Sequence, residues 1–322
     1  MNTFGNKFRL SIFGESHGVG IGVVMDGVPA GIALSEADFE ADLARRRSGA
    51  KGTTPRKESD KPTILSGVFN GYTTGAPIAV TFTNDNTRSS DYSNLVTHPR
   101  PSHADWVASK KYKGFQDYRG GGHFSGRLTL TLAVAGVVAK KILGESVKIN
   151  SEIIALGGST DKGSFEDIVA KAVKELDSVG GIIECRATGV AVGLGEPFFN
   201  SVESILSHLL FSIPAVKGVE FGNGFKAASL KGSENNDPII SADGTTATNN
   251  SGGINGGITN GNPIIVRVAV KPTSSIAKEQ LSLNTETGEV EPMSVHGRHD
   301  ACIALRAPVV VEAAMAIALA QF

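Results

Sequence analysis

Cysteine is scarce in this chain. Only Cys185 and Cys302 occur in 322 residues, far apart and without a CxxC spacing. Structural zinc sites and disulfide frameworks need closely grouped or paired cysteines, so neither is expected, and the pattern fits a reducing cytoplasm. Free cysteines are among the most buried residue types. Both thiols are therefore interpreted as apolar core residues and not as nucleophiles.

Long hydrophobic runs and an excess of one charge are also lacking. No apolar stretch reaches 18 residues, and the first nine residues hold no apolar segment of the length that a secretory signal needs. Lys and Arg number 31 against 32 Asp and Glu, a net charge of −1. No overall field would attract nucleic acid or an anionic membrane. We expect a cytoplasmic protein with no nucleic-acid or membrane partner, in which any anion site is local.

Glycine is abundant, with 39 residues, which predicts many turns and close backbone approaches. No composition break or repeat divides the chain, so a single domain over residues 1–322 is expected. Apolar periodicity predicts strands and helices along its length. The strands are expected at 7–13, 20–28, 64–69, 78–82, 182–192 and 263–270, and the helices at 34–47, 128–143, 164–179, 202–211 and 309–319.

Histidines recur in polar loops beside carboxylates. His17 follows Glu15 in a glycine turn, His103 precedes Asp105, and His296 and His299 precede Asp300. Histidine is the side chain best suited to exchange protons near neutral pH, and loops on a rigid framework often carry active sites. Taken alone, a histidine of this kind is more often a surface residue, or one whose hydrogen bonds are satisfied within the fold, than a catalyst. Their recurrence in three such loops favours convergence on one site.

Basic residues cluster in the same loops. Arg45 to Arg47 end a predicted helix, where the helix dipole and cap explain one or two cations but not all three. The glycine-rich stretch 117–127 precedes the apolar helix 128–143, whose N-terminus would favour a phosphate; a plain helix cap is the alternative. Polar residues 50–61 are interpreted as a lid, and 83–102 as a functional or disordered loop. The basic loops supply Arg46, Arg119, Arg127, Lys271 and Arg298, which indicates a phosphate-bearing substrate, a phosphate-bearing cofactor, or both.

Two other functional classes fit parts of the sequence. Residues 14–18 match G-x-S-x-G, the nucleophile elbow of serine hydrolases, but that elbow lies between a strand and a helix, whereas a strand is expected after Ser16. A nucleotide-binding module without catalysis is the second alternative. The glycines at 120–122 match neither a P-loop nor a dinucleotide-binding fingerprint.

Seven motifs in order make the chain resemble chorismate synthases. They are FGESHG at 13–18, DGVP at 26–29, RRR at 45–47, RPSHAD at 100–105, DYRGGG at 117–122, KPTSS at 271–275 and GRHD at 297–300. The resemblance extends from about residue 7 to residue 319. It implies an α/β fold of the α+β type, a β-α-β sandwich with helices between antiparallel sheets.

The resemblance also implies an activity. Chorismate synthases are carbon–oxygen lyases of the shikimate pathway, in aromatic amino acid biosynthesis. They remove phosphate from 5-enolpyruvylshikimate 3-phosphate by a 1,4-anti elimination that gives chorismate, and they need reduced FMN without net redox change. A cytoplasmic homotetramer, an association with NADP and an external flavin reductant are implied as well, since no second domain is present to reduce the flavin.

Site residues follow from the matching motif positions. His17 would be the acid near the departing phosphate, His103 would protonate or stabilise the reduced flavin, and Asp300 would assist removal of the ring proton. Arg46, Lys51 and Arg127 would bind substrate anions. The flavin would contact His123, Phe124, Ser125, Ala215, Gly256, Lys271, Pro272, Thr273, Ser274, Ser275 and Arg298.

The chain departs from the family pattern in several places. His123-Phe124-Ser125 stands where many relatives have Arg-Ser-Ser, so one cation at the flavin is titratable or absent. The loop after Arg47 is about one residue shorter, with Lys51 near a common Arg position, and Pro214 stands at a position that is commonly Asn. The chain ends soon after its last helix, which predicts that a C-terminal tail is missing.

Overall fold

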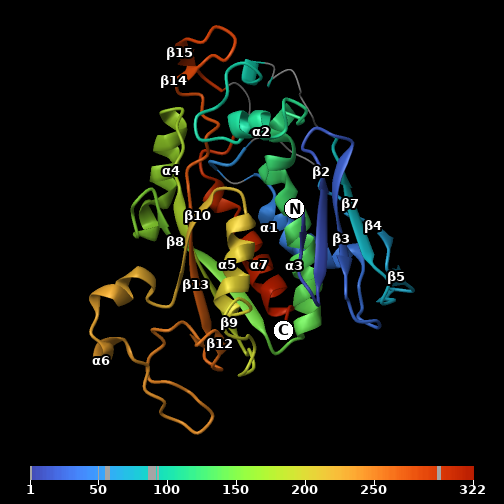
Figure 1. Cartoon of the computed structure of the whole chain (residues 1–322), viewed down its shortest axis with the longest axis vertical. Coiled ribbons are helices and arrows are strands. Elements are labelled where there is room, and N and C mark those ends of the chain that lie inside the picture. The colour runs from blue at the N-terminus through green and yellow to red at the C-terminus, as the bar shows by residue number, and fades with distance from the viewer. Residues whose placement is uncertain (1, 50, 55–58, 86–91, 93, 296–298) are drawn as a thin grey trace.

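Two antiparallel sheets enclose a layer of helices in the computed structural model of the chain (Figure 1). The structure describes residues 2–49, 51–54, 59–85, 92, 94–295 and 299–322. The expected α+β sandwich is confirmed. The first sheet, in the order β1-β2-β3-β7-β4, comprises Thr3–Phe4, Arg9–Gly14, Gly20–Asp26, Ile78–Thr83 and Thr63–Ser66. The second, in the order β10-β13-β9-β8, comprises Val216–Phe221, Ile264–Val270, Gly181–Thr188 and Lys148–Leu156. Between them lie α1 (Glu40–Arg46), α3 (Thr129–Leu143), α5 (Val202–Ser212) and α7 (Pro308–Leu319).

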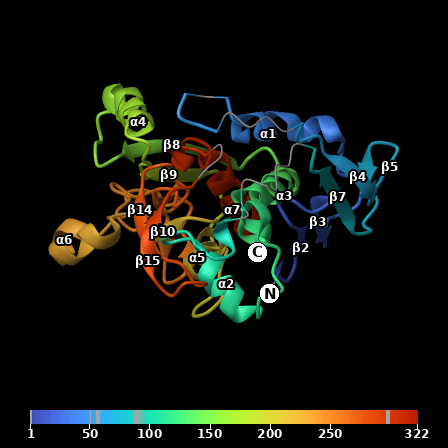
Figure 2. The same cartoon turned by 90° about the horizontal axis from the view of Figure 1, so that it is seen from above.

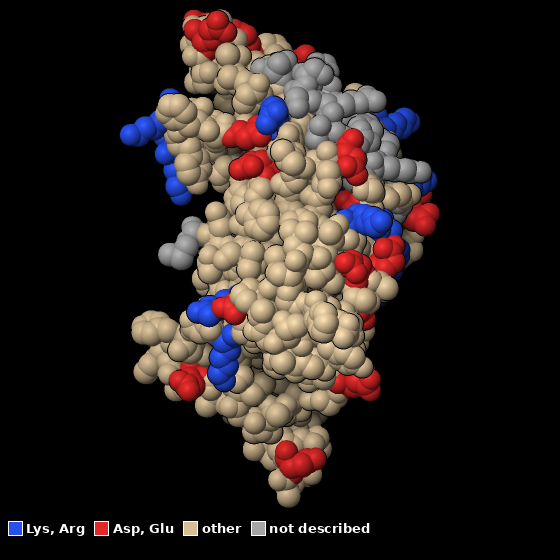
Figure 3. Space-filling view, turned by 90° about the vertical axis from the view of Figure 1, so that its right-hand side faces the viewer, with Lys and Arg blue, Asp and Glu red and all other residues tan. Residues whose placement is uncertain are grey.

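Side-chain alternation gives the first sheet its two faces. Ile21, Val23 and Met25 of β3 are fully buried against the helices, and Val23 pairs with Val80 of β7. The intervening Val24 points outward, as alternation along a strand requires. The space-filling view from this side shows a broad surface with few charged residues over the centre of the sheet (Figure 3).

The centre of the molecule is the contact between α3 and α7, which lie side by side (Figures 1 and 2). Both helices are apolar on nearly all sides, as expected for helices buried on all sides. A Cβ built at Gly136 of α3 would lie 2.4 Å from the Cβ of Ala313 in α7. Glycine at this position therefore sets how closely the two helices approach.

Some elements differ from the sequence-based prediction. Strand β8 was not predicted, and α2 (Asp105–Lys111) and the hairpin β14–β15 (Gln280–Leu283, Val290–Met293) occupy segments without a predicted element. The predicted helix 164–179 ends early, as α4 (Phe165–Lys174), because Leu176 takes a left-handed φ of 57°. The predicted strand 182–192 ends at Thr188, before Gly189 with φ 73°. The remaining short elements are β5 (Val68–Phe69), β6 (Tyr72–Thr73), β11 (Ile254–Asn255), β12 (Ile258–Thr259) and α6 (Gly232–Asn235).

Among the helices that the structure describes, none has the length and apolar character needed to cross a membrane. Residues 50 and 55–58 of the expected lid lie outside the described part of the chain, as do 86–91 and 93 of the long polar loop.

Candidate active site

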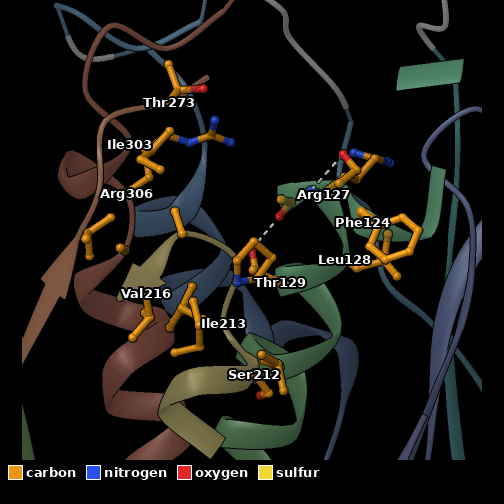
Figure 4. Close-up of a pocket in the computed structure, with 18 of the residues that line it drawn as sticks. Phe124, Arg127, Leu128, Thr129, Ser212, Ile213, Val216, Thr273, Ile303 and Arg306 are labelled. Atoms are coloured by element: carbon orange, nitrogen blue, oxygen red, sulfur yellow. Dashed lines mark hydrogen bonds between the residues drawn. The ribbon is translucent and has the colours of Figure 1, made fainter. Parts of the chain in front are cut away.

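A cavity of about 910 Å³ lies between the helix layer and the loops around α2. Ligand sites of small molecules typically measure about 300–1,000 Å³. Apolar side chains such as Ile213 and Val216 line one part, and Arg127 and Arg306 approach from opposite walls (Figure 4). Acidic residues are few among the described lining residues. The charged ones are Arg46, Arg47, Arg100, Arg127, Lys217, Lys271 and Arg306 against Asp60 and Asp300. The cavity is therefore suited to an anionic ligand.

Three consecutive glycines at the edge of this cavity lie against two histidines that are distant in the sequence. Gly120, Gly121 and Gly122 have φ values of 60°, 82° and 53°, which side-chain-bearing residues rarely adopt. A Cβ at Gly120 would lie 2.4 Å from Cδ2 of His17, and one at Gly121 would lie 3.5 Å from Cε1 of His103. The two imidazoles therefore flank the same turn.

The two histidines differ in their access to the cavity. His103 and Gly120 line it, whereas His17 is only 6% exposed and lies against Gly120. The His17 ring meets Tyr92 edge to face, with ring centroids 5.2 Å apart. The turn that carries Ser16 and His17 joins β2 to β3 of an antiparallel pair. A strand-to-helix nucleophile elbow is thus absent at Ser16, which argues against the hydrolase.

His103 forms a hydrogen-bonded pair with Asp105. Its Nδ1 lies 2.6 Å from Oδ1 of Asp105, and Arg100 donates to both carboxylate oxygens at 2.7 Å. Burial alone would raise the pKa of Asp105, but the hydrogen bonds from Arg100 and His103 hold that pKa well below its usual range. Burial, reinforced by the Arg100 charge, lowers the pKa of His103 although Asp105 opposes this. Assigned from these contacts, neutral His103 donates Nδ1–H to Asp105 and keeps Nε2 as an acceptor.

The predicted anion ligands Arg46 and Arg127 are buried and bound to protein acceptors. Arg46 donates to Thr129 Oγ1 and the Gly126 carbonyl, each at 2.9 Å, and Arg127 donates to Asp60 at 2.9 Å. Burial and the nearby Arg306 charge lower the pKa of Arg46 to about 9. Both residues line the cavity.

Asn84 connects Arg127 to the His17 turn. Its side-chain oxygen accepts from Arg127 Nε at 2.6 Å, and its Nδ2 donates to the carbonyls of Glu15 and Gly18 at 2.9 and 2.8 Å. Sequence analysis did not single out Asn84. Its place in the polar stretch directly after a strand was the only signal.

Asp300 also faces the cavity and is held in place. Its Oδ1 accepts the Thr54 backbone N–H at 2.8 Å, and its Oδ2 lies 3.0 Å from Nη1 of Arg306. Arg306 additionally donates from Nε to the Arg46 carbonyl at 2.8 Å. Arg306 was not among the predicted site residues, although a lone arginine just before an apolar helix was visible in the sequence.

Most predicted flavin contacts meet in this cavity. Lys271 donates through Nζ to the Ser102 carbonyl at 2.6 Å and through its backbone N–H to Ala215 at 2.9 Å, which has an unusual φ of 74°. His123 Nδ1 lies 2.8 Å from the Gly14 carbonyl. The predicted residues that line the cavity are His123, Phe124, Ser125, Ala215, Lys271, Pro272, Thr273, Ser274 and Ser275.

Besides His17, which lies against Gly120, three predicted residues are not placed at the cavity. Lys51 is exposed and is not a lining residue, and neither is Gly256, which lies in the β11–β12 hairpin. Figure 1 places β12 at the opposite end of the molecule from α2. Arg298 lies outside the described residues, as does His296.

Comparisons with known proteins agree on one family. The family model described as chorismate synthase matches residues 8–322. A chorismate synthase of Chitinophaga pinensis is 61% identical over all of this chain and 96% of its own length, and one of Dehalococcoides mccartyi is 45% identical over 99% and 96%. A solved structure described as "Crystal Structure of Chorismate Synthase" superposes with a TM-score of 0.75 at 29% identity, covering 99% of this chain and 92% of the other. The chain therefore belongs to the chorismate synthase family, lyases of the shikimate pathway.

Proposed function

We propose that the chain removes phosphate from 5-enolpyruvylshikimate 3-phosphate by a 1,4-anti elimination, giving chorismate, with reduced FMN bound in the same cavity. One observation supports this above the others. His17 and His103, 86 residues apart in the sequence, flank one glycine turn at the edge of a cavity with seven cationic lining residues.

The residues present fit a flavin. The cavity combines apolar side chains with a cationic loop, and its volume suits a cofactor beside a small ring. His123 to Ser125, Ala215 and Lys271 to Ser275 would hold the flavin, with Arg298 added from the family motif. The pKa of Lys271 is lowered chiefly by burial and further by the charge of nearby Lys217. Two neighbouring ammonium groups favour an anion such as a cofactor phosphate. Reduced flavin supplies an electron-rich ring system, a resource that side chains lack.

Side chains of this chain supply the remaining chemistry. His17 would give a proton to the departing phosphate, whose developing charge Arg46 and Arg127 would neutralise. Asp300, fixed by Thr54 and Arg306, would assist removal of the ring proton. His103, oriented by Asp105, presents a proton-accepting Nε2 at the cavity. A cytoplasmic homotetramer, a role for NADP and an external flavin reductant complete the proposal.

An anaerobic assay with chemically reduced FMN tests the function. Phosphate release from 5-enolpyruvylshikimate 3-phosphate is expected only when reduced FMN is present. His17→Ala and His103→Ala should each lower turnover at least tenfold, the usual scale for a general acid or base. Circular dichroism checks that both variants fold. Near-normal rates in both variants would contradict their assigned roles, and a complete absence of turnover in the wild type would favour a binding module.

A further inference from the structure

Arg306 occupies a place in the cavity that the proposed roles leave unexplained. It lies between the turn Ile303–Leu305 and α7, and its side chain is 20% exposed. Figure 4 shows its guanidinium extending from the wall into the cavity, near Thr273 and across from Arg127.

The hydrogen bonds of Arg306 use only part of its guanidinium. Nη1 faces both carboxylate oxygens of Asp300, at 3.0 and 3.2 Å, and Nε donates to the Arg46 carbonyl. Among the described residues, no hydrogen-bond acceptor is found for Nη2. Its two N–H groups are therefore available to a ligand. A guanidinium with a free pair of donors is well suited to bind a planar carboxylate.

Arg46 and Arg127, two other arginines that line the cavity, differ from Arg306 in this respect. Arg127 directs Nε, Nη1 and Nη2 to Asn84, Asp60 and the Thr83 carbonyl. Arg46 directs Nε and Nη2 to protein acceptors, and its Nη1 lies 3.7 Å from Asp60. A ligand that binds Arg46 or Arg127 would have to displace or share these protein contacts. A ligand that binds Nη2 of Arg306 would displace none.

The chemistry of the reaction indicates which anion would lie here. In a 1,4 elimination the phosphate and the proton leave from opposite sides of the ring. The carbon that loses the proton lies between the ring carbon with a carboxylate and the carbon with the enolpyruvyl group, which has the second carboxylate. Arg306 holds Asp300, the residue proposed to assist removal of the ring proton. The substrate near Arg306 would therefore present these carboxylates and not the phosphate.

We propose that Arg306 binds a carboxylate of the substrate through Nη2 while Nη1 holds Asp300, an inference that rests on the proposed function. The arginine thereby sets the distance between the substrate and Asp300, the residue that assists removal of its proton. Loss of the side chain should weaken substrate binding and, separately, lower turnover at saturation.

Calorimetry tests this proposal by measuring the equilibrium affinity of ligands for the protein with oxidised FMN. Oxidised FMN is used because it does not support turnover. The probes are 5-enolpyruvylshikimate 3-phosphate, shikimate 3-phosphate and inorganic phosphate. Arg306→Gln should weaken binding of the first about tenfold or more, the usual scale for a charge-assisted hydrogen bond. Arg306→Lys should recover part of the affinity but not the turnover, because an ammonium cannot bind two carboxylates in this geometry.

Arg186→Gln is the control, because Arg186 on β9 is paired with Glu184 at 2.6 Å and is not among the residues that line the cavity. It removes the same charge and should change binding of all three probes little. If Arg306→Gln loses affinity equally for 5-enolpyruvylshikimate 3-phosphate and shikimate 3-phosphate, Arg306 binds the ring carboxylate that both compounds share. If it loses affinity only for 5-enolpyruvylshikimate 3-phosphate, Arg306 binds the enolpyruvyl carboxylate. Either outcome supports the proposal.

Other results would overturn it. The inference is wrong if Arg306→Gln and Arg306→Lys bind 5-enolpyruvylshikimate 3-phosphate as tightly as a wild type that also converts it. The proposed function would then still stand. A loss of inorganic phosphate binding as large as that of the substrate would show that Arg306 serves the phosphate. A wild type that neither binds nor converts 5-enolpyruvylshikimate 3-phosphate would refute the proposed function, and the inference with it.

Discussion

Gly120 controls the space available to His17. A methyl group there would lie 2.4 Å from Cδ2 and 2.5 Å from Nε2 of the imidazole, and the residue has a left-handed φ of 60°. We expect Gly120→Ala to displace the His17 ring and lower kcat at least tenfold, since general acid catalysis depends on position. Steady-state kinetics with reduced FMN measure this.

Gly114→Ala provides the control, because Gly114 also has a left-handed φ, of 81°, but nothing lies within 4 Å of the Cβ that it would add and it does not line the cavity. It should retain most of the turnover. If Gly120→Ala is as active as Gly114→Ala, the close contact between the glycine turn and His17 has no catalytic importance.

His103 makes stability depend on pH. Its pKa in the folded chain lies below the ordinary value of 6.5, chiefly because burial disfavours the charged ring. Protons therefore bind the unfolded chain more readily, and the free energy of unfolding should fall as the pH drops below about 6.5. The depressed pKa of Asp105 acts separately, at pH values below its ordinary 3.8.

Urea unfolding between pH 7.5 and 5 tests the histidine contribution. His103→Gln cannot titrate, so its free energy of unfolding should decline less steeply with falling pH than that of the wild type. An identical slope in both proteins would mean that burial of His103 does not perturb its titration.

Some site residues could be predicted from sequence and others could not. His17, His103 and Asp300 stand in recurring glycine-rich or polar motifs that carry local chemical information. Asn84 and Arg306 belong to no such motif, and their importance arises from partners distant in sequence, such as Glu15 for Asn84 and Arg46 for Arg306. A contact made only after folding leaves little trace in the residues on either side.

Helices α3 and α7 approach closely at Gly136 and Ala313. Alanine is intrinsically about 1 kcal/mol better than glycine in a helix. At Gly136, however, the added Cβ would lie 2.4 and 2.6 Å from Cβ and Cα of Ala313. We expect Gly136→Ala to destabilise the protein by about 1–3 kcal/mol, the usual cost of overpacking a core, despite the better helix propensity.

Thermal or urea unfolding measures this change. Gly232→Ala, in the short helix α6, has nothing within 4 Å of its added Cβ and should be close to neutral. A Gly136→Ala variant as stable as Gly232→Ala would mean that the two central helices can separate without cost.

Elements with an apolar period were the predictable part of the fold. Strands β3, β7 and β13 and helices α3, α5 and α7 were found because burial on one or all sides leaves a clear pattern. Strand β8 was missed because its central residues include Asn150, Ser151 and Glu152, as fits a strand at the edge of the second sheet. Helix α2 was missed because a helix of seven residues spans too few turns to establish a period.

At the scale of the whole molecule, the outer face of the first sheet is the surface best suited to contact another copy. Residues of the face, such as Ser11, Phe13, Val24 and Thr81, are uncharged, and Phe13 is 43% exposed. Figure 3 shows charged side chains mainly towards the margins of this surface. Extended surfaces of this kind often mark protein–protein contacts. The proposed homotetramer would bury such a face.

Val24→Asp should therefore reduce subunit association while the subunit stays folded. The carboxylate would lie on the central strand β3 and would lose its hydration in any face-to-face contact. Size-exclusion chromatography with light scattering is expected to report a smaller assembly than for the wild type, with similar circular dichroism. Val290→Asp is the control, on the separate β14–β15 hairpin, where Val290 is 64% exposed and the substitution should leave the mass unchanged. If Val24→Asp keeps the wild-type mass, this face is not an interface and copies of the chain associate elsewhere.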